Sequence, residues 1–217
     1  RRPINPSPEN TFMSLNLPLD RINWKTSIFL MTTTFIALTA VPVYLWYNGL
    51  NTFQVSLFLF YFAATGFSIT LGYHRLFSHL AFKAKWPVKL FTLVFGAAAF
   101  QNSAIDWTSD HRKHHKHVDH DEDPYDISQG FFHAHIGWLL FKLRPEPPLD
   151  NVADLQRDPL VNWQHKWSHL IGFSVGFILP AVLGWIYGGP TQALGAFLIA
   201  GVARLVFVQQ MTFFINS

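Results

Sequence analysis

The sequence predicts an all-α membrane protein in which four transmembrane helices form two hairpins, with a polar helical region between them. Three observations predict this fold class. Half of the 217 residues are apolar and only 13% are charged, whereas soluble domains usually carry about 25% charged residues. Four long segments are apolar and almost free of charge. All eleven histidines fall between the second and third of these segments, from His74 to His169.

Each of the four apolar segments is long enough to cross a bilayer as a helix, which takes about 20 residues. Segments 27–47 and 53–71 are uncharged and are separated by a short turn, which predicts the first hairpin. Segments 170–187 and 192–215 flank a Gly-Gly-Pro turn and predict the second. A further apolar stretch, 88–100, is too short to span, so we expect an interfacial or re-entrant helix there.

The distribution of basic residues predicts the orientation. Of the sixteen Lys and Arg residues, fifteen lie within residues 1–25 or 75–166, and the two hairpin turns carry none. The positive-inside rule therefore places the N-terminus and the histidine-rich region in the cytoplasm. We expect the membrane to be a bacterial inner membrane or the endoplasmic reticulum. Arg204 lies inside the fourth segment, where a charge either serves function or is paired within the bundle for structure.

The ends of the chain and the absence of cysteine set further bounds. Residues 1–25 are expected to be a polar lead-in without a fold of its own. The chain starts at Arg1 and stops at Ser217 inside an apolar pattern, so we expect a fragment at both ends. The lack of cysteine excludes disulfides, thiolate-bound zinc, iron–sulfur clusters and haem held by a thiolate. Any metal must be held by His, Asn or carboxylates.

Two histidine clusters carry the candidate chemistry. His74 and His79 follow the second apolar segment; on an α-helix they would point about 140° apart, so they can share a metal only if the helix ends or bends. His111, His114 and His115 lie three and four residues apart and share one helical face. This second run alone could be a solvated basic face, but two clusters on one side of the membrane favour a metal site. Imidazole ligands without thiolate suit iron, copper or zinc.

The motif HRLFSH at 74–79, followed by HRKHH at 111–115, resembles the first two histidine boxes of the integral-membrane fatty acid desaturases, near the stearoyl-CoA Δ9 type. The resemblance covers about residues 20–217. It extends to AFQN at 99–102, DW at 106–107, DP at 123–124, GFFHAHIGWLL at 130–140 and NS at 216–217. It assigns residues 26–217 to a fatty acid desaturase domain that is truncated at its C-terminus, because the third box of the family is absent.

The resemblance implies a centre of two iron ions that uses O2 to insert a cis double bond into a fatty acyl chain. It implies six metal-contacting side chains in this chain, the last of them directly or through water: His74, His79, His111, His114, His115 and Asn216. Four further ligands of the family are expected downstream. No separate side-chain acid or base is expected to take part in catalysis.

The resemblance also implies a path for the substrate. Some matching residues bend the acyl chain, others lie near the thioester and CoA, and a basic residue pairs with the CoA phosphates. The residues expected to bend the acyl chain are Gln101, Trp107 and Thr212. Those expected near the thioester and CoA are Asn102 and Asp110. The basic residue expected to pair with the phosphates is Lys142, with Arg144 close by. Considered alone, Trp107 would be an interfacial anchor and Lys142 a solvated charge. The expected partners are an acyl-CoA or acyl-lipid, O2, a b-type cytochrome or ferredoxin with its reductase, and membrane lipid, but no nucleic acid.

Several features leave alternatives open. Ser109 stands where the animal CoA enzymes carry an Arg that contacts CoA, so an acyl-lipid carrier remains an alternative. Five histidines match no ligand of the family and are expected at the surface or behind the ligands: His117, His120, His133, His165 and His169. His135 matches a family histidine that is not a ligand. A membrane di-iron hydroxylase is the alternative enzyme, and a His-rich metal transporter is the alternative from another class.

Overall fold

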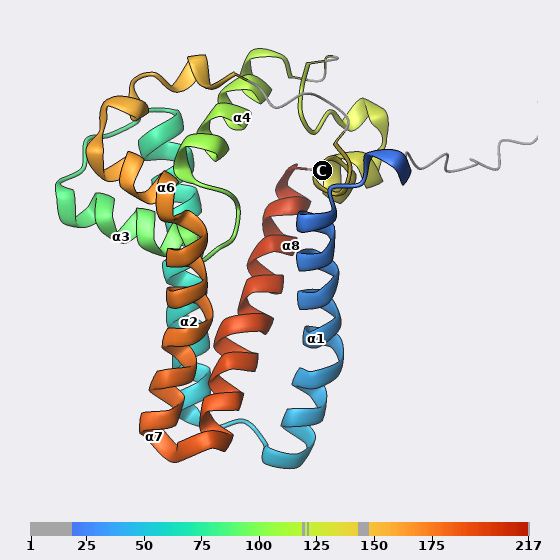
Figure 1. Ribbon diagram of the computed structural model, residues 1–217, viewed down its shortest axis with the longest axis vertical. Helices are drawn as coiled ribbons and strands as arrows, with labels where there is room; N and C mark the ends of the chain where they lie inside the picture. Colours follow the sequence, from blue (N-terminus) through green and yellow to red (C-terminus); the bar gives the residue numbers. More distant parts are fainter. Residues whose placement is uncertain (1–18, 119, 121, 143–147, 217) are drawn as a thin grey trace, which may run out of the picture.

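The computed structural model describes residues 19–118, 120, 122–142 and 148–216, without the side chain of Asn216. These residues form helices joined by loops, and no strand occurs among them apart from one backbone bridge between Ile22 and Phe141. Long helices run along the vertical axis, and shorter ones gather at the end where α1 begins and α8 ends (Figure 1). The predicted all-α fold class is confirmed.

Three helical runs are long and apolar enough to cross a membrane. The first is α1 (Trp24–Asn48), and the second, Thr52–Ser78, joins α2 (Thr52–Phe67) to the π-helix η2 (Ser68–Ser78). The third, Pro159–Ile215, passes through α6 (Pro159–Phe173), η7 (Ser174–Ile178), α7 (Leu179–Ala196), η8 (Phe197–Ala203) and α8 (Arg204–Asn216).

The third run reverses its direction within α7. Gly188 and Gly189 leave helical geometry there, and Gly189 adopts a φ of 76°, which glycine reaches without steric cost. The chain therefore turns back on itself at the end of the molecule far from the short helices (Figure 1). This break lies at the Gly-Gly-Pro turn that the sequence marks as the second hairpin.

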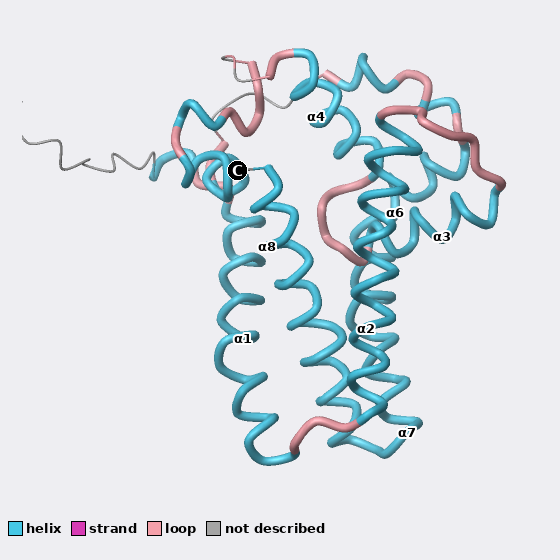
Figure 2. The backbone as a smooth tube through the Cα atoms, turned by 180° about the vertical axis from the view of Figure 1, so that it is seen from behind, coloured by secondary structure: helices cyan, strands magenta, loops and turns pink. Residues whose placement is uncertain are grey.

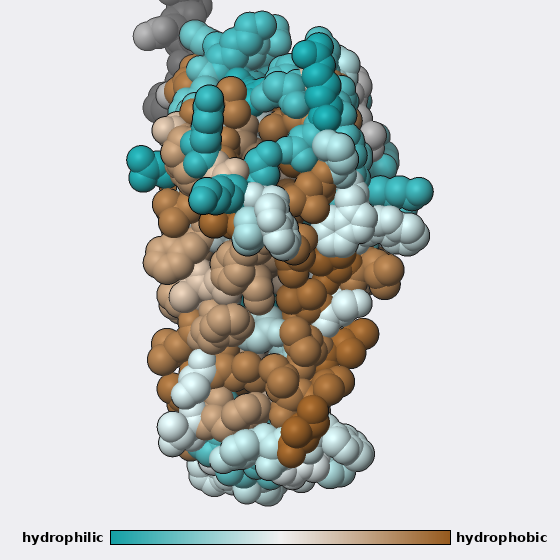
Figure 3. Space-filling view, turned by 90° about the vertical axis from the view of Figure 1, so that its left-hand side faces the viewer, coloured by the Kyte–Doolittle hydropathy of each residue, from teal (hydrophilic) through white to brown (hydrophobic). Residues whose placement is uncertain are grey.

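The remaining helices are short and cover one end of the molecule. They are η1 (Leu19–Arg21), α3 (Trp86–Ala97), α4 (Ala104–Lys116), η3 (Ile127–Gln129), η4 (His133–Gly137), α5 (Trp138–Leu140), η5 (Leu149–Val152) and η6 (Leu155–Arg157). Most loops lie at this end as well (Figure 2). The apolar helix α3, which occupies most of the stretch 88–100, is indeed too short to span. The surface is mainly apolar along the helical legs and hydrophilic around the short helices (Figure 3).

A polar network joins the two turns at the opposite end of the molecule. The side-chain amide of Gln54, which is buried, donates hydrogen bonds to the hydroxyl of Tyr44 at 2.8 Å and to Oε1 of Gln192 at 3.1 Å. Asn51 donates to the same Gln192 oxygen at 2.7 Å, and Tyr44 donates to the carbonyl of Thr191 at 3.2 Å. The α1–α2 turn and the turn within α7 are therefore hydrogen-bonded to each other.

Arg204 is fully buried at the start of α8. Its guanidinium donates to the carbonyls of Ala98 at 2.8 Å, Ala200 at 3.0 Å and Gly176 at 3.2 Å, and lies 5.6 Å from the ring centroid of Tyr61. Among the described residues its partners are carbonyls rather than a carboxylate. The charge is turned into the bundle and fastens α8 to η7 and to the end of α3, which supports the structural alternative for this residue.

Candidate metal centre and adjoining cavity

His74 and His79 converge because the helix that carries them is a π-helix. Hydrogen bonds in a π-helix run over five residues instead of four. The N–H of His79 donates to the carbonyl of His74 at 3.1 Å, and the hydroxyl of Ser78 donates to the carbonyl of Tyr73 at 2.8 Å. The Nε2 atoms of the two histidines consequently lie 3.0 Å apart. The wider turn of the π-helix therefore brings the two imidazoles together, a role that the sequence assigned to a helix end or bend.

The second histidine cluster, on α4, faces this pair. Nε2 of His111 lies 3.2 Å from Nε2 of His79 and 3.0 Å from Nε2 of His115. The ligand nitrogens of His74, His79, His111 and His115 all lie within 4.8 Å of one another. Burial, with the neighbouring histidines, lowers the pKa of His111 to about 3, so this imidazole is neutral near pH 7 and able to ligate. Four imidazoles around one point fit a single metal ion of the iron, copper or zinc group.

His114 is held apart from these four histidines by a carboxylate. Its Nδ1 lies 2.8 Å from both oxygens of Asp123, which is fully buried, and its ring stacks on Tyr125 with the centroids 4.4 Å apart. An ionised carboxylate only accepts hydrogen bonds, so Nδ1 carries the proton and Nε2 is left as the ligand atom. The sequence motif DP contains Asp123, but nothing in its spacing from His114 points to this pairing.

Helix α6 fixes the helices that carry the histidines. Ser103 caps the N-terminus of α4, and its hydroxyl lies 2.7 Å from Nδ1 of His165 on α6. The neighbouring Gln164 accepts the N–H of Ala104 at 3.1 Å and donates to the hydroxyl of Tyr73 at 2.7 Å. Both contacts are buried. His165 thus contacts the residue that caps the N-terminus of α4.

The other histidines outside the cluster lie at its periphery or beside the cavity. His117 lies 3.3 Å from Glu122, and His135 lies 3.1 Å from the side-chain oxygen of Gln210. His120 is exposed. His133 and His169 line the cavity described next.

A cavity of about 900 Å³ adjoins the histidine cluster. Trp107 and His111 form part of its wall, and their rings stack 4.6 Å apart. Six of the seven residues that the sequence assigns to the substrate also line it: Gln101, Asn102, Trp107, Asp110, Lys142 and Thr212. The seventh, Arg144, lies outside the described residues. Residues that are up to 111 positions apart in the chain therefore meet in one space.

Polar groups along this wall are fixed by contacts of their own. The side-chain amide of Gln101 donates to the hydroxyl of Thr212 at 2.9 Å, which links the loop before α4 to α8. Burial, with the nearby charge of Asp106, raises the pKa of Asp110 to about 6. Lys142 is exposed where the cavity meets the surface. The cavity therefore has a lining of both polar and apolar residues, with the exposed cationic side chain of Lys142 among them.

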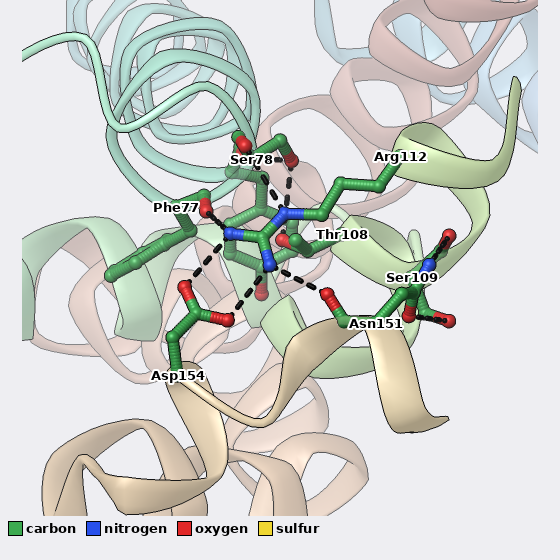
Figure 4. A network of polar contacts seen from close by, with 8 residues as sticks. Phe77, Ser78, Thr108, Ser109, Arg112, Asn151 and Asp154 are labelled. Carbon is green, nitrogen blue, oxygen red and sulfur yellow. Dashed lines mark hydrogen bonds and ion pairs between the residues drawn. The ribbon is translucent and has the colours of Figure 1, made fainter. Parts of the chain in front are cut away.

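Two further positions bear on the expected site. Asn216 is the last residue of α8, and its side chain lies outside the described part of the chain. Ser109 is buried and exchanges two hydrogen bonds with Asn151: its hydroxyl donates to Oδ1 at 2.8 Å, and the side-chain amide of Asn151 donates back to its carbonyl at 2.9 Å (Figure 4). The side chain of Ser109 is thus hydrogen-bonded to Asn151 of η5.

The family model for fatty acid desaturases matches residues 51–216, which include both histidine clusters and the main part of the cavity wall. The chain belongs to the fatty acid desaturase family. Known desaturases similar to it include a probable acyl-CoA desaturase of Schizosaccharomyces pombe, 38% identical over 90% of this chain and 40% of the relative. Acyl-CoA desaturase 1 of Saccharomyces cerevisiae is 35% identical over 84% of the chain and 37% of the relative.

A Delta(9)-fatty-acid desaturase of Caenorhabditis elegans is 40% identical over 70% of this chain and 46% of the relative. The chain thus spans less than half the length of these desaturases. The resemblance that the two histidine boxes indicate is confirmed, and the fatty acid desaturase family, together with three long apolar helices, indicates an integral membrane protein.

Proposed function

We propose that this chain carries the front part of the active site of an O2-dependent fatty acyl desaturase that acts on acyl-CoA, with a Δ9-type reaction as the closest match. One observation carries the proposal: His111 belongs both to the four-histidine cluster and to the wall of the cavity. A substrate in that cavity would lie directly beside the metal ligands. The names of the relatives, acyl-CoA desaturase and Delta(9)-fatty-acid desaturase, support the substrate class.

The donor set supports two iron ions, as is general in this family. His74, His79, His111 and His115 would hold one ion, since their nitrogens surround one point. His114, turned aside by Asp123, would serve the second ion, with Asn216 as a further ligand. When bound, the iron pair supplies the activation of O2 and the removal of two hydrogens from adjacent methylene groups. The protein's own side chains hold the metals and fix the acyl chain.

The residues that line the cavity are suited to fixing the acyl chain. The indole of Trp107, packed against His111, forms a bulky wall that would bend a passing acyl chain, and the linked pair of Gln101 and Thr212 borders the same space. Asn102 and Asp110 would lie near the thioester. Lys142 at the rim would pair with CoA phosphates, a role that Lys and Arg commonly fill, and Arg144, which follows closely in the sequence, is proposed for the same role.

The membrane arrangement belongs to the same proposal. The reversal at Gly188 and Gly189 divides the third apolar run into two legs, so that four spans form two hairpins. The concentration of basic residues around the histidines supports a cytoplasmic active site. Electrons would then come from a small cytoplasmic-side donor, a b-type cytochrome or ferredoxin with its reductase. A tag at residues 115–160 that is accessible only from the opposite side would contradict this orientation.

The enclosed Ser109 favours one alternative carrier. Ser109 lines the cavity, but it carries no charge and its hydroxyl donates to Asn151, so CoA would lose one of its contacts here. An acyl-lipid substrate, which carries no CoA, is therefore the second candidate.

The test uses membranes that contain the complete protein, a saturated acyl-CoA, O2 and a reduced electron donor. We expect monounsaturated acyl chains, detected by mass spectrometry. His115→Ala should abolish the product while membrane insertion stays intact, and His120→Ala, an exposed histidine outside the cluster, should retain it. Retained turnover in His115→Ala would refute the assignment. Turnover of lipid-bound chains alone would leave the iron chemistry in place and change the carrier.

A further inference from the structure

Arg112 lies on α4 between the proposed ligands His111 and His115, and its side chain points toward Phe77 and Ser78 at the end of η2 (Figure 4). Neither the histidine-box pattern nor the cavity gives it a role. Its guanidinium is mostly buried, with 21% of the side chain exposed. A planar guanidinium has five N–H donors in fixed directions, so its partners show what it holds together.

All five donors of Arg112 have an acceptor. Nε donates to the carbonyl of Ser78 at 3.2 Å, and Nη2 donates to the carbonyl of Phe77 at 2.8 Å. Nη1 donates to the carbonyl of Asn151 at 2.7 Å. The two remaining N–H groups make a two-pronged pair with the carboxylate of Asp154, at 2.7 and 2.9 Å. The hydrogen bond from Arg112 holds the pKa of Asp154 below its usual range.

The two carbonyls from η2 lie directly before His79. The last carbonyls of a helix lack partners within the helix and need one from elsewhere. The π-helix is a rare form, and the approach of His79 to His74 depends on it. Because Arg112 supplies the missing donors at this end, it stabilises the turn that brings the first two histidines together.

The same side chain connects three segments that are far apart in the sequence. It sits on the helix with His111 and His115, it binds the end of the π-helix with His79, and it binds the segment from η5 to η6 through Asn151 and Asp154. A lysine could keep the charge, but it has a single nitrogen and cannot reach carbonyls on opposite sides of this junction. These contacts thus require the several N–H donors of a guanidinium, and a positive charge alone could not replace them.

We propose that Arg112 is a positioning residue for the metal centre, which fixes the distance between the first and second histidine pairs of the four-histidine cluster and makes that distance depend on the segment around Asp154. The inference rests on the proposed metal centre, because it concerns the relative placement of its ligands. The five N–H donors of Arg112 go to backbone carbonyls and to Asp154 rather than to the ligand nitrogens.

The test compares Arg112→Lys with Arg75→Lys in the complete protein, purified in detergent and stripped of metal. Arg75 gives a matched control, since it lies beside His74 but its side chain is exposed. The probe is Co²⁺ alone, and the readouts are its affinity by equilibrium dialysis and its visible absorption spectrum at saturation. We expect Arg112→Lys to bind Co²⁺ about 10- to 100-fold more weakly, the usual effect of losing a residue that orients ligands, with shifted absorption bands. Arg75→Lys should match the wild type.

The spectrum separates positioning from general stability. A residue that only stabilised the fold would lower the melting temperature but leave the bands of the folded, saturated protein unchanged. Should Arg112→Lys fail to fold, Asp154→Asn supplies the second variant, because that carboxylate is partly exposed and its loss leaves the carbonyl contacts of Arg112 in place. It should shift the bands in the same direction, but less.

The possible failures are distinguishable. Wild-type protein that binds no Co²⁺ would refute the proposed metal centre. Wild-type binding with an unchanged affinity and spectrum in Arg112→Lys, or in Asp154→Asn where Arg112→Lys does not fold, would refute the positioning role and leave the metal centre in place.

Discussion

The packing between α3 and η2 predicts that a single methyl group at Gly96 destabilises the protein. A Cβ there would lie 2.4 Å from Cε1, 2.7 Å from Cζ and 2.9 Å from the hydroxyl oxygen of Tyr73. The ring cannot step aside, because it is fully buried and its hydroxyl accepts a hydrogen bond from Gln164 at 2.7 Å. Overpacking of this kind costs about 1–3 kcal/mol. A chain of 150–250 residues loses about 2–4 °C in Tm per kcal/mol, so we expect Gly96→Ala to lower Tm by roughly 2–12 °C.

Thermal unfolding in detergent micelles, followed by circular dichroism at a fixed scan rate, measures this change. Gly66→Ala on α2 is the matched control, because a Cβ there would meet nothing within 4 Å. In a helix this change is expected to stabilise by about 0.5–1 kcal/mol, so Tm should stay level or rise. Tyr73 directly precedes His74, and metal binding should therefore weaken in Gly96→Ala as well. An equal Tm for both variants would refute the rigid contact between Gly96 and Tyr73.

Four further predictions concern the site. Trp107→Ala should lower kcat and broaden the distribution of double-bond positions, as product analysis by mass spectrometry would reveal, whereas a unique position would contradict its bending role. Lys142→Glu should raise KM for acyl-CoA far more than it lowers kcat, since the phosphates contribute mainly uniform binding; an unchanged KM would remove Lys142 from the CoA site. Asp123→Asn should weaken binding of the second iron, with the iron content falling from about two toward one per protein, and full content would contradict the pairing with His114. Metal-free protein should lose stability as pH falls below 6.5, because folded His111, with a pKa of about 3, binds fewer protons than the unfolded residue. His111→Gln should flatten the dependence of Tm on pH below about 6.5, and an unchanged slope would count against this reasoning.

The apolar segments and the clustered histidines were predictable because their signals are local. A span is a run of about 20 apolar residues, and the boundaries predicted for the first span, 27–47, fall inside α1 (Trp24–Asn48). The spacing in HRKHH places His111 and His115 one helical turn apart, and the structure brings their nitrogens to 3.0 Å. Such patterns carry their meaning within a few residues.

The features that the sequence did not predict depend on contacts between residues that are far apart in the chain. Whether residues 68–78 form an α-helix or a π-helix is expected to depend on hydrogen bonds from outside, such as those of Arg112 to Phe77 and Ser78, which are 35 and 34 residues away. The bond from Gln164 to Tyr73 joins positions that are 91 residues apart. No periodicity in the sequence encodes such pairings, so the reason for the convergence of His74 and His79 could not be derived from it.

The hydrogen bonds between the α1–α2 turn and the turn within α7 have a consequence for the synthesis and membrane insertion of the protein. Gln54 belongs to the first hairpin and its partner Gln192 to the second, 138 residues later. At about 5–20 residues per second, the ribosome needs roughly 7–28 s to supply that partner. During this interval the side-chain amide of Gln54 has Tyr44 of its own hairpin as a partner. The acceptors that Gln192 and Thr191 provide to Gln54, Asn51 and Tyr44 are still missing, and a polar group that lacks a partner is costly in lipid. We therefore expect the first hairpin to stay in contact with the insertion machinery, without stable packing, until the second hairpin is inserted and forms these hydrogen bonds.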